Sequence, residues 1–585
     1  MLLLLLALQV AAPPPSRPAP APVPQNLVDI RELQPREYRV AGFVLATPQD
    51  VRIDAIGAEP RADRLGSDGD SWSWRDDERS TWPAAAWILD ARTREVVWDL
   101  RAADTERQPS GLREFSGTVR LPAGVYEAHY ASYAAARLSK IQGLGLVRAQ
   151  LGGPYVEDKS YKRFAITVIA VGRAARPAEL DAARRAFTAA AIVTLQPAPE
   201  NTGRFAFELG RPTAVEVFAI GELTKDNAAD YGWIINADTH ARVWTMDLAH
   251  SEPAGGAQKN RLVHETLRLP AGRYVAYFTC DDTHDPHEWT AVPAYDPELW
   301  GLTLLVADSS ARRAIRPFDY EPVPAGQTIV SLTGIGDRET RSSAFTVKRP
   351  LEVRVYAIGE GVNDGMVDYA WIVDARAHRR IWTMRLAETQ EAGGSAKNRV
   401  FDRTLRLAAG DYVVYYTSDG SHSAQAWNAA PPAEGRWWGV SVFPASGRLD
   451  PAIVGPFDRA AAPNVLAALM RTENDAQPER AFTLDRPAAV RVYAIGEGVS
   501  DEMVDYGWIE ESATGRVVWK MTYDATTPAG GVAKNRAFDG VIHLAAGAYV
   551  LHYRSDGSHA YGNWNDSLPD DPDAWGVTVF RTRDR

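Results

Sequence analysis

The sequence predicts an all-β protein made of four tandem antiparallel β-sandwich repeats, jelly-roll-like and of about eight strands each. Short runs such as V-R-V-Y-A-I and Y-V-V-Y-Y alternate and are rich in β-branched and aromatic residues. Gly, Pro, Asn and Asp separate these runs at intervals of about 8–12 residues, which is typical of a sandwich or barrel. A long motif string that returns three times indicates the tandem arrangement.

The repeated string contains D-Y-A-W-I, A-G-G-S-A-K-N-R, S-D-G-S-H and W-W-G-V in its third-unit form. The same 78 positions separate its first Glu from its last Trp in all three copies: Glu222 and Trp300, Glu360 and Trp438, Glu497 and Trp575. A fixed repeat of this kind marks one structural unit. Because loops normally tolerate insertions, loops that keep their length in three copies are expected to be held in place.

These patterns divide the chain into a signal peptide at 1–12, a Pro-rich linker at 13–25, and β-sandwich repeats at 26–172, 186–308, 325–445 and 463–582. The first segment is apolar and ends in small residues, as secretory signals do, and it is shorter than the roughly 20 residues of a membrane span. We therefore expect a secreted or periplasmic protein with no membrane insertion after signal removal. Pro177 to Ala190 is the best helix candidate.

Charge and cysteine content restrict the partners. The formal net charge of −11 argues against a nucleic acid, which attracts clustered Lys and Arg. Cys280 is the single cysteine, so neither a disulfide framework nor a Cys-rich zinc site is expected.

The first repeat departs from the others. It keeps W-I-L-D and L-P-A-G-V-Y but lacks both K-N-R and D-G-S-H. Its third loop is a longer insert that contains Trp72, Trp74 and Trp82. Terminal repeats are often atypical because they cap an array, so a cap or spacer is expected, with a separate Trp-rich binding loop as the alternative.

Strand parity predicts where the repeated polar residues lie. In the third copy, strands are expected to begin near these residues: Thr328, Ser343, Leu351, Asp368, Arg380, Arg399, Asp411 and Trp438. Successive antiparallel strands reverse direction, so connections 3–4, 5–6 and 7–8 leave the sandwich at one end. Those three connections carry the repeated polar motifs, which should therefore converge.

The D-G-S-H motif allows two interpretations. Asp419 and Ser421 suit an Asx-type turn, which leaves His422 unexplained. Alternatively, Asp368 or Glu360 from the neighbouring loop would complete a metal site. Oxygen ligands would then favour Ca²⁺ and histidine a transition metal.

The K-N-R motif also allows two interpretations. Arg399 could pair with Asp368 or Asp419 and lock the loops, with Lys397 solvated and Asn398 capping a turn. Alternatively, the donors face sugar hydroxyls or a carboxylate.

The tryptophans fall into two groups. Trp371, Trp382 and Trp438 alternate with apolar strand positions and are expected in the core. Trp427 lies in a loop, five residues after His422, where it either stacks on a sugar ring or plugs the end of the sandwich.

Two residue sets follow. The predicted ligand-binding set is Lys397, Asn398, His422, Trp427, Asn428, Lys534, Asn535, His559, Trp564, Asn565, Lys259, Asn260, His284 and Trp289. The predicted structural loop network is Glu360, Asp368, Arg399, Asp419, Ser421, Asp505, Arg536, Asp556, Asp230, Arg261 and Asp281.

The strand scaffold resembles a known family. F-T-L-D-R-P-A-A-V-R-V-Y-A-I-G (Phe482 to Gly496) and L-A-A-G-A-Y (Leu544 to Tyr549) are similar to the bacterial pre-peptidase C-terminal jelly-roll modules. The resemblance covers the scaffold of each repeat and carries over no functional residue. It implies an exported accessory module.

The predicted function is an exported, non-catalytic repeat protein whose loop faces bind an extracellular glycan or cell-surface polymer. The alternative is a structural spacer in which the same residues pin loops and seal unit interfaces. A metal-dependent hydrolase is less favoured, because adjacent Ser421 and His422 point apart, and three copies suit avidity better than catalysis. No cofactor is expected apart from the Ca²⁺ alternative. A binder should expose Trp427, His422 and Lys397 together, whereas a spacer should bury or pair them.

Overall fold

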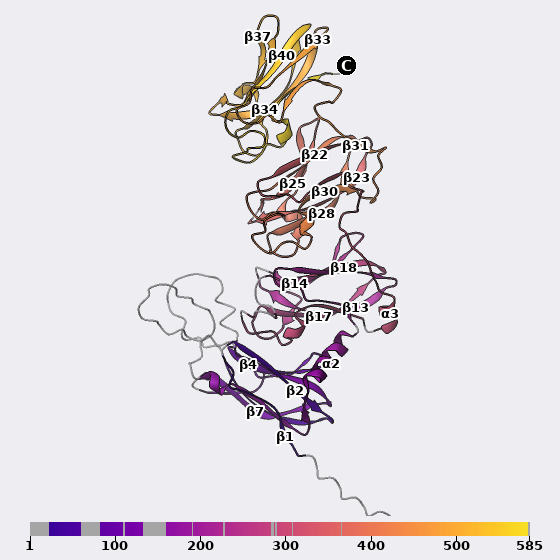
Figure 1. Cartoon of the computed structure of the whole chain (residues 1–585), viewed down its shortest axis with the longest axis vertical. Coiled ribbons are helices and arrows are strands. Elements are labelled where there is room, and N and C mark those ends of the chain that lie inside the picture. The colour runs from indigo at the N-terminus through magenta and orange to yellow at the C-terminus, as the bar shows by residue number, and fades with distance from the viewer. Residues whose placement is uncertain are drawn as a thin grey trace, which may run out of the picture.

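The computed structural model describes residues 23–34, 36–59, 82–108, 111–132, 160–189, 191–225, 228–281, 286, 289, 291–306, 308–363 and 365–582. Four β-sandwich units follow one another in a column, with the fourth unit at the C-terminal end (Figure 1). This confirms the predicted all-β class and its tandem sandwiches.

The described residues of the first unit form ten strands and one short helical turn: β1 Gln25–Arg31, β2 Glu37–Leu45, β3 Gln49–Ala58, β4 Ala84–Asp90, β5 Val96–Asp99, β6 Glu106–Arg107, β7 Leu112–Leu121, β8 Gly124–Ser132, η1 Ser160–Arg163, β9 Ala165–Ala170 and β10 Arg173–Ala174. Helix α2 (Pro177–Thr188), predicted from the sequence, joins it to the second unit.

The second unit repeats this order: β11 Ala191–Leu195, β12 Thr202–Leu209, β13 Thr213–Leu223, β14 Ala228–Asn236, β15 Arg242–Thr245, β16 Glu252–Pro253, β17 Asn260–Leu269, β18 Gly272–Thr279, η2 Pro297–Leu299, β19 Gly301–Leu305, α3 Ser309–Arg313 and β20 Arg316–Pro317.

The third unit has the same strands with one further short one: β21 Val330–Thr333, β22 Thr340–Val347, β23 Leu351–Val362, β24 Gly365–Met366, β25 Tyr369–Asp374, β26 Arg379–Thr383, η3 Leu386–Glu388, β27 Gln390–Glu391, β28 Asn398–Leu407, β29 Gly410–Thr417, η4 Gly435–Trp437, β30 Gly439–Pro444 and β31 Val454–Pro456.

The fourth unit comprises β32 Val465–Met470, β33 Glu479–Leu484, β34 Ala488–Val499, β35 Glu502–Met503, β36 Tyr506–Glu511, β37 Arg516–Lys520, η5 Tyr523–Ala525, β38 Thr527–Pro528, β39 Asn535–Leu544, β40 Gly547–Arg554, η6 Pro572–Ala574 and β41 Gly576–Arg581.

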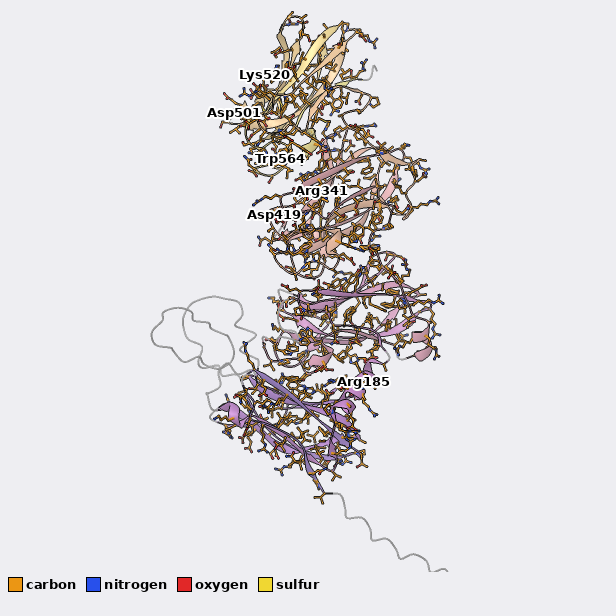
Figure 2. All side chains as sticks on the ribbon, in the orientation of Figure 1. Arg185, Arg341, Asp419, Asp501, Lys520 and Trp564 are labelled. Atoms are coloured by element: carbon orange, nitrogen blue, oxygen red, sulfur yellow. The ribbon has the colours of Figure 1, made fainter. Side chains whose placement is uncertain are left out.

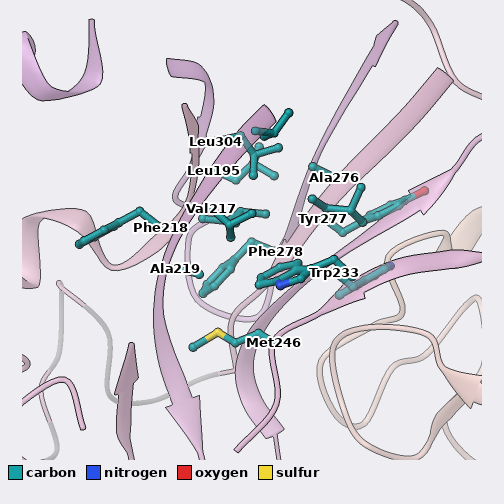
Figure 3. Close-up of a cluster of buried hydrophobic side chains, with 14 of the residues drawn as sticks. Leu195, Val217, Phe218, Ala219, Trp233, Met246, Ala276, Tyr277, Phe278 and Leu304 are labelled. Atoms are coloured by element: carbon teal, nitrogen blue, oxygen red, sulfur yellow. The ribbon is translucent and has the colours of Figure 1, made fainter. Parts of the chain in front are cut away.

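In the third and fourth units the sandwich consists of two separate sheets with four main strands each, whereas in the first and second units the pairings β3–β4 and β13–β14 join the two layers into one sheet. In the third unit one layer runs β21-β30-β23-β28 and the other runs β26-β25-β29-β22. The fourth unit follows the same orders, β32-β41-β34-β39 and β37-β36-β40-β33. The inward side chains of the two layers form a separate core in each unit, shown for the second unit in Figure 3.

The strand register repeats as well and fixes the positions of the polar loops. Glu360 faces Asn398 across β23 and β28, and Glu497 faces Asn535 across β34 and β39. The corresponding pair in the first unit is Ala58 and Leu112. Identical register over ten residue pairs delivers the loops after these strands to the same end of each sandwich.

Candidate functional site

The three polar loops of the third unit meet at one end of the sandwich, as parity predicts. The loop before β25 supplies Asp368, whose Oδ1 accepts the backbone N–H of Asp419 at 2.8 Å. The loop before β28 supplies Asn398, whose Oδ1 lies 2.6 Å from His422 Nε2. Gly359 makes this close approach feasible, because a Cβ there would lie 2.1 Å from the Asp368 carbonyl oxygen.

Asn398 bridges two loops rather than capping a turn. Its Nδ2 donates to the carbonyl oxygens of Gly393 and Ala430, both at 2.9 Å. Its Oδ1 must therefore be the acceptor, so Nε2 of His422 carries the proton. Nδ1 of the same ring lies 2.9 Å from Asn428 Oδ1.

Lys397 is paired, not solvated. Its Nζ lies 3.0 Å from Oε1 of Glu360 and also donates to Asn428 Oδ1. Trp427 packs edge-on against both His422 and Trp438, with ring centroids 5.0 Å apart in each case. The predicted ligand-binding residues of this unit therefore contact one another.

Burial shifts the pKa values of the acidic and histidine side chains at this end of the third unit. Burial, reinforced by Asp419 and Glu360, raises the pKa of Asp368 to about 8 against the hydrogen bond from the Asp419 backbone. Burial and the Lys397 ammonium lower the pKa of His422 to about 4. The imidazole is therefore neutral at pH 7.

The Asx turn is confirmed at Asp419, whose Oδ1 accepts the Ser421 backbone N–H at 2.9 Å. His422 follows with a φ of 56°, which places its backbone in the left-handed region. This turn directs the imidazole inward, and its side chain is fully buried.

The fourth unit reproduces the arrangement. Lys534 Nζ lies 2.9 Å from Glu497 and 2.6 Å from Asn565 Oδ1, and His559 Nε2 lies 2.7 Å from Asn535 Oδ1. Asp505 accepts the Asp556 backbone N–H at 2.9 Å, and burial raises its pKa to about 7. Trp564 packs edge-on against Trp575 at 5.0 Å.

The second unit keeps the framework with one difference. Lys259 pairs with Glu222 at 2.8 Å, and Asp230 accepts the Asp281 backbone N–H at 2.8 Å. Here Oδ2 of Asp230 also accepts the Trp300 indole N–H at 2.8 Å. Asn260 bridges Gly255 and Val292, while Trp289 packs edge-on against Trp300. His284, Trp72 and Trp74 lie outside the described residues.

The predicted pairing of Arg399 with Asp368 or Asp419 is wrong. Its Nε donates to Thr389 Oγ1 at 3.0 Å and its Nη2 to the Thr389 carbonyl oxygen at 3.3 Å. Thr389 immediately precedes the edge strand β27, so the guanidinium binds there. The counterparts behave alike, with Arg536 on Thr526 and Arg261 on Ser251.

The core assignment holds for Trp438 but is wrong for Trp371. Trp438 is fully buried between the two layers of its unit. Trp371 is also fully buried, but on the outer face of β25 and β29, and its Nε1 donates to the Asp570 carbonyl oxygen of the fourth unit at 2.8 Å. Trp382 is half-buried against the core of its own unit, as Trp82 is in the first.

Sequence reasoning missed the contacts between consecutive units, here called joints. At joint one, between units one and two, Arg94 donates from Nε and Nη2 to both carboxylate oxygens of Asp296, at 2.7 and 2.6 Å. Glu127 lies 3.1 Å from the same guanidinium, and all three side chains are buried. Trp87 Nε1 donates to the Tyr295 carbonyl oxygen at 2.8 Å.

At joint two the buried acid is Glu434 of the third unit. It pairs with Arg204 and accepts the Tyr277 hydroxyl at 3.2 Å. Gly393 lies on the Trp233 ring so closely that a Cβ would approach it to 2.8 Å. The Gly394 backbone N–H donates to Thr279 Oγ1 at 2.8 Å.

At joint three the buried acid is Asp571 of the fourth unit. It accepts from Arg459 at 2.7 Å and from the Tyr415 hydroxyl at 2.7 Å, and it lies 2.8 Å from His378 Nδ1. Burial alone would raise the pKa of Asp571, but Arg459 and His378 hold it well below its usual range. Arg380 lies over the Trp371 ring at 4.5 Å.

The joints share a sequence signal. Each buried acid stands four residues before the last Trp of its repeat and caps a short 3₁₀ helix: Asp296 before Trp300, Glu434 before Trp438, and Asp571 before Trp575. The docking loops carry the A-G-G motif in all three units and, in the third and fourth units, a Pro two residues before the buried acid. Contact between consecutive units therefore explains why these loops keep the same length in all three copies.

No helix within the described part of the chain is long and apolar enough to cross a membrane. Figure 2 shows Asp419 and Trp564, from consecutive units, on the same side of the array.

No family model matches the chain, so the resemblance to pre-peptidase C-terminal modules is not confirmed. No curated protein matches it either. A solved structure of the CUB1-EGF-CUB2 domains of rat MASP-1 is similar over 44% of this chain and 95% of that chain, at 10% identity and a TM-score of 0.13. A likeness this low carries no argument about function.

Proposed function

We propose that the chain is an exported, non-catalytic stalk whose four sandwiches are locked into one rigid column. The observation that carries this proposal is the recurrence of one buried acid at each joint. Asp296, Glu434 and Asp571 are each almost fully buried in a socket of the preceding unit. A chain of loosely linked domains does not need a buried, charged contact at every boundary.

The identity of the joint partners supports rigidity as well as contact. A buried ion pair is costly unless its geometry is good, so it fixes orientation more than it adds stability. At joint one both oxygens of Asp296 face the Arg94 fork, which admits one relative orientation of the two units. The flat rings of Trp87, Trp233 and Trp371 form the apolar part of the three contacts.

The first unit, which lacks the polar network, also supports the stalk function. It has Ala58 where the other units have Glu, and Leu112 where they have the paired Asn. Its outward face retains Trp87 for joint one. The polar network is therefore present in the three units whose loop ends dock onto a preceding unit.

Glycan binding is the second candidate. The half-buried Trp427 and Trp564 belong to equivalent loops, and Figure 2 places the Asp419 and Trp564 regions on one side of the column. Repetition on one side would provide avidity for a polymer. Against this, Lys397 is engaged by Glu360 and Asn428, and the His422 Nε2–H by Asn398.

Two measurements on the full chain separate these functions. Negative-stain electron microscopy should show straight particles of one length if the stalk proposal holds. A glycan array should give no signal that Lys397→Ala with Lys534→Ala abolishes. Particles of variable curvature would contradict the stalk, and a glycan signal lost in that variant would establish binding instead.

A further inference from the structure

Two clusters of carboxylates lie at the loop ends of the third and fourth units. Glu360, Asp368 and Asp419 each offer one oxygen within 4.8 Å of the others, and Glu497, Asp505 and Asp556 do the same. Ca²⁺ binds oxygen at about 2.3–2.6 Å, so ligands on opposite sides of one ion lie about 4.6–5.2 Å apart. Each cluster is therefore no wider than the coordination sphere of one Ca²⁺ ion.

The inner carboxylates of these clusters carry buried oxygens without a hydrogen-bond partner. In the third unit these are Oε2 of Glu360, whose residue is 6% exposed, and Oδ2 of Asp368, which is 0% exposed. Glu497 and Asp505 of the fourth unit repeat this pattern. Burying a carboxylate oxygen without a partner is costly, so four such atoms at equivalent positions call for an explanation.

Neighbouring hydrogen-bond donors do not account for these buried oxygens. Lys397 occupies the other oxygen of Glu360, Oε1, and the Asp419 backbone N–H occupies Oδ1 of Asp368. The Trp438 indole N–H lies close enough to offset part of the rise in the pKa of Asp368. It does not reach hydrogen-bond geometry with Oδ2. When all three carboxylates are ionised, they and the Lys397 ammonium carry a formal charge of −2, which a divalent cation would balance.

The other two units show the pattern changed in an informative way. In the second unit Oδ2 of Asp230 accepts the Trp300 indole N–H at 2.8 Å, so its two oxygens are both engaged. In the first unit the positions of Glu360 and Asp368 are Ala58 and Ala84, which pair across the strands. The unit that lacks the acids thus replaces both inner carboxylates by apolar side chains.

We propose that Glu360, Asp368 and Asp419 bind one divalent cation and that Glu497, Asp505 and Asp556 bind a second, with Ca²⁺ as the matching ion. The donors are all carboxylate oxygens, which suit a hard cation, and Asp419 is exposed, so water can complete the six to eight ligands that Ca²⁺ takes. The cations tie the loop before β25 to the loop after β29, and the equivalent loops in the fourth unit.

The test is calorimetric titration of the EDTA-treated full chain with CaCl₂, together with its thermal unfolding midpoint. We expect two ions bound per chain and a higher midpoint. The double variant Asp368→Asn with Asp505→Asn should lose the binding heat and the rise in midpoint while its unfolding without Ca²⁺ remains cooperative. Glu352→Gln, at an exposed carboxylate of β23, should bind as the unchanged protein does.

A second pair of variants keeps the test decisive if the buried substitutions prevent folding. Asp419→Asn with Asp556→Asn changes the outer ligands and should weaken Ca²⁺ binding at least tenfold. Absence of binding heat in the unchanged chain, or binding that both double variants leave intact, would overturn the proposal. This result does not depend on the stalk function. A flexible array of units could still bind the ions, and a rigid array could exist without binding them.

Discussion

The guanidinium of Arg94 in the first unit holds both carboxylate oxygens of Asp296 in the second unit, at 2.7 and 2.6 Å, inside a fully covered joint. Glu127 shares the same guanidinium at 3.1 Å. Arg184 of α2 donates to the other oxygen of Glu127 at 3.1 Å, so Arg94 links two buried carboxylates from different units and Arg184 supports one of them. Folding of the first unit and docking of the second depend on the same side chain.

Arg94→Ala should be among the most damaging single substitutions at this joint, because it leaves the buried Asp296 without its bidentate partner and Glu127 with Arg184 as its guanidinium partner. Breaking a buried pair costs about 3–5 kcal/mol. Hydrogen exchange of β4 and β8 across a denaturant series measures the loss. Arg185→Ala, at an exposed position of α2, is the control and should change stability by less than about 0.5 kcal/mol. Equal, small losses for the two variants would refute this account of joint one.

Trp371→Ala should loosen joint three while leaving the core of the third unit intact. The ring is buried against the fourth unit rather than between the layers of its own. Truncating a buried Trp costs about 3–5 kcal/mol, which here falls on docking. Hydrogen exchange should rise in the loop that contains Asp570 and stay unchanged in β23.

Trp508→Ala provides the matched control, because Trp508 is the corresponding residue in the last unit. It stacks on His552 at 4.8 Å and its indole N–H donates to Glu510 of the same unit at 2.9 Å. No joint should change in this variant. If both Trp variants affect joint three equally, the assignment of Trp371 to the joint is wrong.

Arg399→Ala should cost about 1–2 kcal/mol, since it removes hydrogen bonds to Thr389 and not a buried ion pair. Thermal unfolding of the full chain measures the change, with Arg406→Ala on the exposed face of β28 as the control. A loss as large as that of Arg94→Ala would show that the guanidinium has an acidic partner after all.

These residues also show what the sequence predicts and what it does not. Strand positions and the convergence of the polar loops follow from alternation and parity, because both are properties of the local chain. The partner of Arg399 does not follow, since Thr389 and Asp368 are both within reach of a long side chain. Nor does the sequence distinguish a core position from a joint position for Trp371, because burial in a joint and burial in a core leave the same apolar pattern.

The joints could have been found from one signal in the sequence. An acid four residues before the last Trp, in three copies whose other loop residues change, marks a constrained position. The partner of each buried acid cannot be predicted from the sequence. Arg94, Tyr277 and Arg459 come from different places in the preceding unit or linker. Charge complementarity across a joint becomes visible when the units are docked.

The buried His422 and His559 contribute stability to the third and fourth units that acid removes. The pKa of each falls to about 4 in the folded state, from about 6.5 when unfolded, because of burial and a nearby ammonium. The unfolded state then takes up more protons, so stability is present above pH 6.5 and is lost as pH falls towards 4. The expected loss between pH 7.5 and pH 5 is about 2 kcal/mol per histidine.

The variant His422→Gln with His559→Gln isolates this effect, because Gln can still donate to Asn398 and Asn535 and the carboxylates are common to both proteins. Denaturant unfolding at the two pH values gives the comparison. The variant should lose about 4 kcal/mol less than the unchanged chain. The same acid sensitivity in both proteins would mean that the imidazoles are not the cause.

Small-angle X-ray scattering of the full chain in solution tests the rigid column most directly. The account predicts the profile of a single elongated particle, unchanged between low and high salt, because the acids at the joints are shielded from solvent. The triple variant Asp296→Ala, Glu434→Ala and Asp571→Ala should instead scatter as units that reorient about their linkers. A flexible profile for the unchanged chain, or superimposable profiles for the two proteins, would contradict the stalk.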